Sequence, residues 1–134
     1  MIVTLCVEDR GGMLFGTRRV SRDSAQQQDL LTLCGEHRLW MNAYSAPLFN
    51  DAAVSVDEEF LRRAGEGEFC FVENQPLLPV LDRIEGLVVY HWNRSYPSTM
   101  KLDLDLGAFA LTEIREFPGN SHETITREIY ERRK

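Results

Sequence analysis

The sequence lacks several features that would assign it to a specialised class of protein. None of its apolar runs approaches the roughly 20 residues that a membrane-spanning helix needs. No segment with the pattern of a signal peptide precedes the first predicted strand, so we expect a cytoplasmic protein. Internal repeats, low-complexity tracts and linkers are also absent. The 134 residues therefore predict a single domain, 1–134, with a core of its own.

Metal-binding patterns and paired cysteines are missing as well. The chain has three cysteines and three histidines, and no spacing among them matches that of a metal site. The cysteines, Cys6, Cys34 and Cys70, are odd in number, and each has apolar neighbours. We therefore predict buried, reduced thiols and no metal site.

The chain also lacks the excess of basic residues that nucleic-acid-binding proteins carry. Its formal net charge is −6, and residues 51–85 hold nine acids against three arginines. We therefore expect no nucleic-acid partner. The local exception is the group Arg18, Arg19 and Arg22, three arginines within five positions of the first long loop.

What the sequence does contain is an alternation of short apolar runs and helical patterns. Residues 2–7 form an unbroken apolar run, which predicts a strand buried on both faces and central to the molecule. After a long loop, Asp23 and Gln26 have the spacing of a capping box, and Gly35 ends the helix that they begin. The other expected elements are strands at 38–41, 53–56, 69–72 and 87–92, a helical turn capped by Ser45, and helices at 58–64 and after Pro76.

The last third of the chain predicts extended structure. Apolar and polar residues alternate over 100–106, which favours a half-exposed extended segment, and two long strands at 109–117 and 122–132 flank a turn at 118–120. The order of elements predicts an α/β fold, a three-layer sandwich whose mixed, mostly parallel sheet ends in an antiparallel C-terminal hairpin. Ligands bind such sheets beyond the carboxyl ends of the strands.

Over most of its length the chain resembles the dihydrofolate reductase-like fold family. That family begins with a buried strand, a mobile loop and a helix bearing the catalytic carboxylate, which correspond here to 2–7, 9–20 and Asp23. The stretch GLVVYHWNRSYP resembles the family's strand that leads to an aromatic-Pro turn, and SHETITREIYERR resembles its last strand. The resemblance implies a compact, degenerate bacterial member in which Asp23 corresponds to the proton carrier of a reductase.

Two departures from the family concern its NADPH site. The family has a Gly-Arg-x-Thr turn where this chain reads NAYS at 42–45, so Ala43 replaces the arginine. The family's Gly-Gly pair is replaced by Glu73 and Asn74. A pyrophosphate needs close backbone approach and positive surroundings, and Glu73 supplies a bulky carboxylate instead. The cofactor therefore stays unknown, and we expect the usual NADPH binding to be lost.

Two residues are candidates for catalysis, and each has a structural alternative. Asp23 is either an acid–base carboxylate or only a helix cap. His122 can act as acid, base or ligand, or it is a hydrogen-bonded structural histidine. Ser121, His122 and Glu123 do not form a triad in our interpretation, because neighbours on a strand point to opposite faces.

The candidates for ligand binding lie at the expected strand ends. The three arginines either bind an anionic ligand or pair with the acidic middle segment. The aromatic and polar side chains from Trp92 to Tyr96 either hold a planar ligand or form a packing corner. The full set of expected ligand-binding residues is Arg18, Arg19, Arg22, Asn42, Tyr44, Ser45, Glu73, Asn74, Trp92, Asn93 and Arg94.

Four functions stay open on these grounds. The first is a protein that binds a small molecule in the cleft at the strand ends. The second is a reductase-like oxidoreductase that uses Asp23 as proton carrier. The third is an RNA-cleaving nuclease, with the arginines holding phosphate and His122 transferring protons. The fourth is a homo-oligomeric interaction module, a homodimer formed through the acidic segment or the terminal hairpin.

Overall fold

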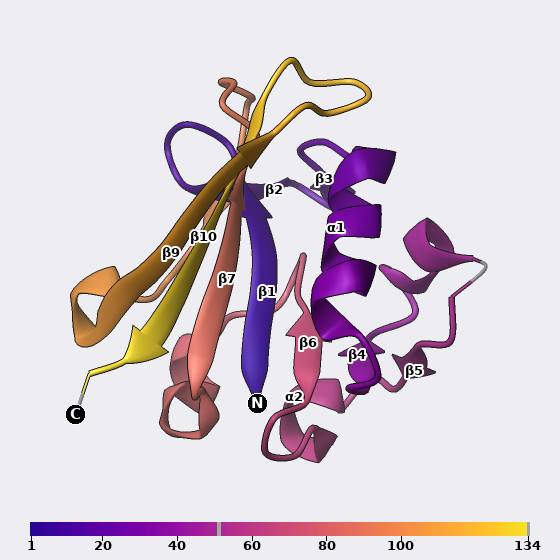
Figure 1. Cartoon of the computed structure of the whole chain (residues 1–134), viewed down its shortest axis with the longest axis vertical. Helices are drawn as coiled ribbons and strands as arrows, with labels where there is room; N and C mark the ends of the chain where they lie inside the picture. Colours follow the sequence, from indigo (N-terminus) through magenta and orange to yellow (C-terminus); the bar gives the residue numbers. More distant parts are fainter. Residues whose placement is uncertain (51, 134) are drawn as a thin grey trace.

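A seven-stranded sheet forms the body of the protein, and a small three-stranded sheet lies at one end of it (Figure 1). The computed structural model describes residues 1–50 and 52–133. In order across the large sheet, the strands are β5 (Ser55–Val56), β4 (Leu39–Met41), β6 (Phe69–Phe71), β1 (Ile2–Val7), β7 (Gly86–His91), β10 (Ile125–Arg132) and β9 (Phe109–Phe117). The five neighbouring strands β5, β4, β6, β1 and β7 run parallel to one another. Strands β10 and β9 add an antiparallel hairpin beside β7. The predicted mixed, mostly parallel sheet is confirmed.

Strand β1 occupies the centre of this sheet, as its sequence predicts. It pairs in parallel with β6 on one side and with β7 on the other, where the register joins Val3 to Leu87 and Val7 to His91. Val3 and Leu5 are fully buried. An apolar run with no polar alternation suits this position, because both faces of a central strand are covered.

The two faces of the sheet carry two separate apolar cores. Helix α1 (Ser24–Cys34) covers one face and packs Leu30 among side chains that include Phe71. The short helices α2 (Phe60–Arg63) and η2 (Leu78–Arg83) lie over the other core, which contains Leu5. Alternate residues of the central strands therefore face different cores, and the molecule has the three layers that the sequence predicts.

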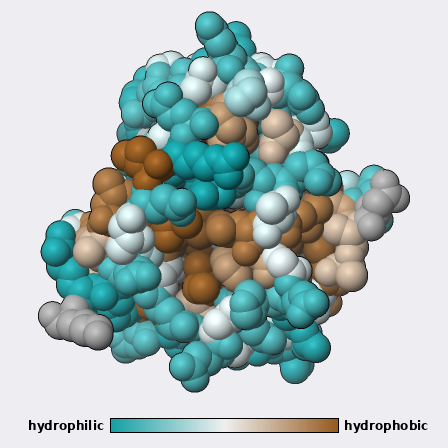
Figure 2. All heavy atoms as spheres, viewed as in Figure 1, coloured by the Kyte–Doolittle hydropathy of each residue, from teal (hydrophilic) through white to brown (hydrophobic). Residues whose placement is uncertain are grey.

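Polar and apolar side chains separate along the strand direction. Figure 2 shows apolar side chains across the middle of the face that α1 covers, whereas the end with the loops above β1 and β7 is mostly hydrophilic. That end is the carboxyl edge of the parallel strands, where a ligand is expected in such sheets.

Helix α1 begins and ends where the sequence predicts. Asp23 is its N-cap, with φ −158°, and its carboxylate accepts a hydrogen bond from the backbone N–H of Ala25. Gly35 ends the helix at φ +56°, a conformation that glycine adopts without strain. The second half of the predicted capping box is different, because Gln26 is buried and its side-chain Nε2 has no hydrogen-bond partner among the described residues.

The other helices are shorter than the apolar spacing predicts. Residues 58–64 yield the single turn α2, and the segment after Pro76 forms the 3₁₀ helix η2. The turn η1 (Ala46–Phe49) is also 3₁₀, and the hydroxyl of Ser45 does not cap it. The prediction of a Ser45 cap is therefore wrong, and this hydroxyl has a different partner, described below. In η1 and η2 a proline stands in the first turn, where its missing N–H costs no helical hydrogen bond.

The first loop, which the family resemblance predicts to be mobile, contains two short strands. Its residues form β2 (Gly12–Phe15) and β3 (Arg18–Arg19), which join β8 (Met100–Lys101) in the small sheet. Strand β8 is all that remains of the extended segment expected over 100–106, since the helical turn η3 (Leu106–Ala108) soon follows. The pairing of Gly12 with Lys101 joins residues far apart in the sequence, which local patterns do not reveal.

The three cysteines are free thiols, with Cys34 and Cys70 buried and Cys6 partly buried. The prediction of reduced thiols is confirmed, and burial raises the pKa of each thiol. Within residues 1–50 and 52–133, no helix combines the length and the apolar character needed to cross a membrane.

Candidate functional site

Polar side chains meet at the carboxyl edge of the sheet in two neighbouring groups. The first, which we call the imidazole cluster, contains Ser21, Asp23, Trp92, Tyr96, Ser121 and His122. The second, the Glu73 cluster, contains Arg19, Tyr44, Ser45 and Glu73. Loop residues contribute most of these side chains, while β4, β6, β7 and α1 fix the backbone on which they stand.

Asp23 is the anchor of the imidazole cluster. Its carboxylate accepts hydrogen bonds from the backbone N–H groups of Ala25 (2.8 Å), Asn120 (3.0 Å) and Ser121 (2.8 Å). The Nδ1 of His122 lies 3.0 Å from its Oδ2, and neither side chain is exposed by more than 2%. Burial acts to raise the pKa of Asp23, but the hydrogen bonds from Asn120, His122 and Ser121 outweigh it and hold that pKa well below its usual range. Asp23 therefore stays ionised.

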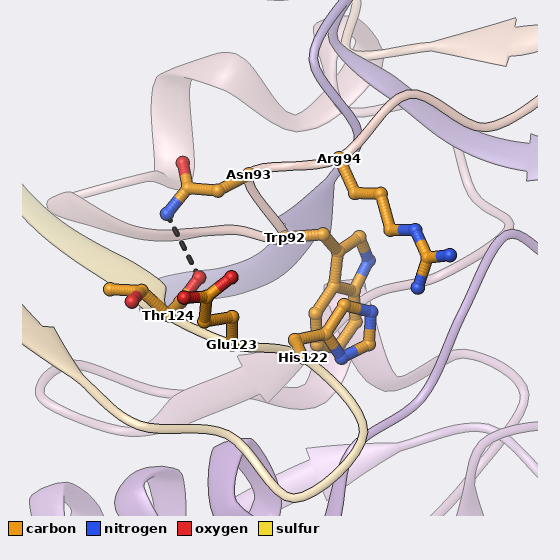
Figure 3. Close-up of a pocket in the computed structure, with 6 residues that line it drawn as sticks. All are labelled: Trp92, Asn93, Arg94, His122, Glu123 and Thr124. Carbon is orange, nitrogen blue, oxygen red and sulfur yellow. Dashed lines mark hydrogen bonds between the residues drawn. The ribbon is translucent and has the colours of Figure 1, made fainter.

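The imidazole of His122 is held on three sides. With Asp23 ionised, Nδ1 carries the proton, and Nε2 is free to accept one. Two hydroxyl groups face Nε2, Tyr96 Oη at 2.8 Å and Ser21 Oγ at 3.0 Å. The ring also stacks on Trp92, with centroids 4.5 Å apart and planes 18° apart (Figure 3). Few rotations remain open to this imidazole, so its Nε2 is aimed at the hydroxyls.

One sequence prediction about this segment is wrong. Residues 121–123 are not part of a strand, since β10 begins only at Ile125. In the loop, Ser121 Oγ lies 3.1 Å from Asp23 Oδ2 and His122 Nδ1 lies 3.0 Å from the same oxygen. The argument from alternating strand faces therefore does not apply here, and Ser121 and His122 point toward one carboxylate.

The Glu73 cluster contains an ion pair between a partly buried arginine and a buried carboxylate. Arg19 Nε lies 2.9 Å from Glu73 Oε2, and Ser45 Oγ donates to Glu73 Oε1 at 2.8 Å. The hydrogen bond with Glu73 raises the pKa of Arg19. The guanidinium also lies over the Tyr44 ring at 4.8 Å. Arg19 thus pairs with the acidic middle segment, one of the two alternatives that its sequence context leaves open.

Comparison with known proteins identifies the fold. No known family model matches the sequence, and no curated protein matches it. Among solved structures, the chain is similar to that of dihydrofolate reductase from Enterococcus faecalis complexed with NADP(H) and RAB-propyl. The TM-score is 0.71, the sequence identity is 9%, and the match covers 99% of this chain and 96% of the other. The fold is dihydrofolate reductase-like. At this identity the likeness concerns the fold alone.

The dihydrofolate reductase-like fold raises the question whether a dinucleotide fits. Two donors at the end of β4, where the family resemblance places cofactor phosphates, bind carboxylates of the chain itself. Ser45 Oγ donates to Glu73, and the backbone N–H of Ala43 donates to Glu58 at 2.8 Å. The Nδ2 of Asn42 donates to Asn74 Oδ1 at 2.9 Å, and Asn42 Oδ1 accepts from the Ser45 N–H at 3.2 Å. A pyrophosphate here would meet two carboxylates and few free donors, so the residues present do not fit this group.

The remaining predicted ligand residues divide between two clefts. A cleft of about 340 Å³ is lined by Trp92, Asn93, Arg94, His122, Glu123 and Thr124. A wider cleft of about 680 Å³ is lined by Arg19, Ser21, Arg22, Asp23, Ser24, Asn120 and Ser121. The imidazole cluster contributes side chains to both. Arg18 is exposed and lines neither of them.

Asn93 has a structural task at the end of β7. Its φ is +57°, and its Nδ2 donates to Thr124 O at 3.0 Å (Figure 3). The same Nδ2 also donates to Thr126 Oγ1 at 2.9 Å. Asn93 therefore fixes the loop that carries His122. Arg94 is exposed, and its guanidinium lies 5.7 Å from the Tyr96 ring centroid.

Sequence reasoning missed three residues that matter to the site. Ser21 and Ser121 were not expected, and Tyr96 was expected only as a stacking ring. The one local signal is that Ser21 lies two positions before the cap Asp23. Glu8 was missed as well. It is buried and accepts from the Gly12 N–H at 2.7 Å, which holds the turn after β1.

The other two histidines lie outside the site. His37 is exposed, and His91 on β7 pairs with Glu128 on β10. Over the described part of the chain, no group of three or more His, Cys, Asp or Glu side chains is placed to hold a metal ion.

Proposed function

We propose that this chain binds a small anionic molecule at the carboxyl edge of its sheet, in the cleft beside Arg22, and that it does so without a dinucleotide cofactor. The observation that carries the proposal is the position of a buried, fixed acid–imidazole pair under that cleft. An ionised carboxylate that orients a buried imidazole beneath an open cleft is an arrangement that recurs at functional sites.

The chemistry of the wider cleft supports an anion. Arg22 is exposed and lines it together with Arg19, whose guanidinium is already committed to Glu73. Hydroxyl and amide groups of Ser24 and Asn120 line the same cleft. A guanidinium flanked by such donors matches a carboxylate or a phosphate ester. The three free thiols agree with action in the reducing cytoplasm.

A thermal-shift series tests this proposal. The probes are inorganic phosphate, citrate, a nucleoside monophosphate, folate, FMN, NADH and NADPH, each at millimolar concentration. A ligand at a hundred times its dissociation constant adds about 2.7 kcal/mol, which a melting curve resolves. We expect at least one small anion to raise Tm, and NADPH to add nothing beyond the matched monophosphate.

Two arginine variants show where the anion binds. Arg22→Ala should remove the shift. Arg62→Ala should preserve it, because Arg62 is an exposed arginine of α2 that pairs with Glu59 away from this edge. The proposal fails if no anion shifts Tm, or if the shift persists in Arg22→Ala.

The reductase alternative depends on Asp23 as a proton carrier, and the surroundings of this residue argue against that role. A carboxylate with so low a pKa does not release or take up a proton near neutral pH. A shift with NADPH that exceeds every monophosphate would favour the reductase instead.

The nuclease alternative rests on His122, whose Nε2 is placed to transfer a proton. Arg22 and Arg94 are exposed on the two clefts beside it. Cleavage of a fluorescent single-stranded RNA that is lost in His122→Ala would support this alternative. We expect no cleavage, because the net charge of −6 opposes a polyanionic substrate.

A further inference from the structure

The imidazole of His122 joins a buried carboxylate to a hydroxyl that lines a cleft. Its Nδ1 lies 3.0 Å from Asp23 Oδ2, and its Nε2 lies 3.0 Å from Ser21 Oγ. We propose that Ser21 is a nucleophile activated by His122 and Asp23, and that the protein hydrolyses small carboxylic esters. This proposal goes beyond ligand binding and does not depend on which anion the cleft holds.

The roles of the three side chains follow from their hydrogen bonds. Asp23 is ionised and fixed by backbone donors, so it holds His122 in the tautomer with the proton on Nδ1. The Nε2 lone pair then faces the Ser21 hydroxyl and can take its proton. A nucleophile next to a base that a third group orients is the arrangement found in serine hydrolases on unrelated folds.

The solvent exposure of Asp23, His122 and Ser21 suits nucleophilic attack by Ser21. Asp23 and His122 are buried, while Ser21 is only partly buried and lines the cleft of about 680 Å³. Trp92 covers one face of the imidazole (Figure 3). The reacting oxygen is thus open to a small substrate, and the base and its carboxylate are shielded from water. Arg22 lines the same cleft and can face the negative charge that develops on the ester carbonyl oxygen.

Tyr96 is the competing hydroxyl at this position. Its Oη lies 2.8 Å from His122 Nε2 and 3.2 Å from Ser21 Oγ. The neutral imidazole has one lone pair at Nε2 and can accept from only one of the two hydroxyls at a time. When Tyr96 occupies Nε2, the Ser21 hydroxyl donates to Tyr96 Oη instead of to the base. Removal of the Tyr96 hydroxyl should therefore increase the reactivity of Ser21.

The reaction balances without a cofactor. Ser21 Oγ forms a bond to the ester carbonyl carbon as its proton moves to Nε2. The carbon–oxygen bond to the alcohol then breaks, and the proton on Nε2 passes to the departing alcohol. Water next attacks the acyl-serine and gives a proton to Nε2, which returns it to Ser21 Oγ as the carboxylic acid leaves. Ester and water become acid and alcohol.

Covalent labelling of the whole chain with an alkyl fluorophosphonate tests the proposal. We expect one phosphonyl group per chain by intact mass, located on Ser21 by peptide mapping. Ser21→Ala should abolish it. Ser55→Ala is the matched control and should label at the wild-type rate, because Ser55 lies on β5, the outer strand at the other side of the sheet. His122→Gln should slow labelling about 100-fold or more, as expected for loss of a general base.

Hydrolysis of p-nitrophenyl acetate gives the second readout, with Tyr96→Phe expected to exceed the wild type. Circular dichroism spectra show whether each variant is folded. Absence of labelling in folded wild-type protein overturns the proposal. So does labelling that persists in Ser21→Ala, or that maps to Tyr96. Since the probe carries no negative charge, these outcomes are independent of the thermal-shift results with anions.

Discussion

Asp23 serves the helix and the site with the same carboxylate. One contact caps α1, and the others hold the loop from Asn120 to His122 against the helix N-terminus. A helix cap alone contributes on the order of 1 kcal/mol. The further contacts to the loop place the imidazole, so Asp23 is the predicted helix cap and also positions His122.

Gly119 makes this contact possible, and its substitution is our first prediction. A Cβ at this position would lie 2.6 Å from both Asp23 Oδ2 and the backbone oxygen of His122. Gly119→Ala should therefore displace the loop and lower the free energy of unfolding by about 1–3 kcal/mol, measured by urea denaturation. Gly65→Ala is the control, because the nearest atom to its Cβ, on Glu68, is 3.5 Å away. Equal stability of the two variants would contradict the prediction.

The pH dependence of stability gives a second prediction at this scale. The folded-state pKa of Asp23 lies below its unfolded value, so its contribution is present above about pH 4 and is lost as the pH falls further. Asp23→Asn should cost about 2 kcal/mol at pH 7 and less near pH 3. Urea midpoints measured from pH 3 to pH 7 check this.

The acid-dependent slope should be reduced in Asp23→Asn rather than abolished. Hydrogen bonds lower the pKa of Glu8, Glu68 and Glu85 in the folded state too, despite partial burial, and these groups remain in the variant. A variant that loses the same free energy at pH 3 as at pH 7 would show that the charge of Asp23 is not what stabilises the loop.

At the scale of elements, the strands of the large sheet were predicted from the sequence more accurately than the segments between them. Runs such as 2–7 and 87–92 are mostly apolar without alternation, and most of their side chains are buried because both faces of the strand are covered. The small sheet was not predicted, because β2 pairs with β8 across more than eighty residues. The local pattern of apolar and polar residues indicates which residues are buried, but it does not indicate which distant strands pair.

The ion pair between Arg19 and Glu73 ties β3 to the end of β6, and it supplies the third prediction. Their side chains are 23% and 8% exposed. Arg19→Ala leaves the Glu73 carboxylate buried without its cation and should cost about 3 kcal/mol. Glu73→Gln in the same chain should restore much of that loss, because an amide oxygen can still accept from Ser45.

A double-mutant cycle measures this coupling. The four proteins, wild type, the two single variants and the double variant, are unfolded in urea under one condition. Additive losses would mean that Arg19 and Glu73 do not stabilise the fold as a pair.

At the scale of the whole molecule, the fold could be predicted from the sequence more completely than the site. The order of strands and helices was enough to predict a mixed, mostly parallel sheet with a terminal hairpin, because βαβ units have few permitted topologies. The dihydrofolate reductase-like fold was predicted from the family resemblance. The site depends on contacts such as Asp23 to Asn120, which are 97 residues apart in the chain. Both residues lie in loops with no periodic pattern. Asp23 and Asn120 come into contact only in the folded chain. The sequence indicated Asp23 and His122 as separate candidates and did not predict that they interact.

The homodimer that the sequence leaves open has a natural place in this fold, and its test is the fourth prediction. Strand β9 is the outer edge of the sheet, with Leu111 and Ile114 about half exposed. Antiparallel pairing of two copies centred on Ile114 would place Glu113 of each opposite Arg115 of the other. Opposite charges at facing positions favour such pairing. We therefore expect a dimer by light scattering at high protein concentration.

Ile114→Lys should convert this dimer to a monomer. The residue meets its own copy at the symmetry axis, where two lysines repel each other. Leu78→Lys is the matched control, since Leu78 is an equally exposed apolar residue on η2, away from the edge. The pairing is excluded if the wild-type chain has the monomer mass at every concentration, or if both lysine variants dissociate alike. The second result would indicate that general surface hydrophobicity, rather than the β9 edge, holds the copies together.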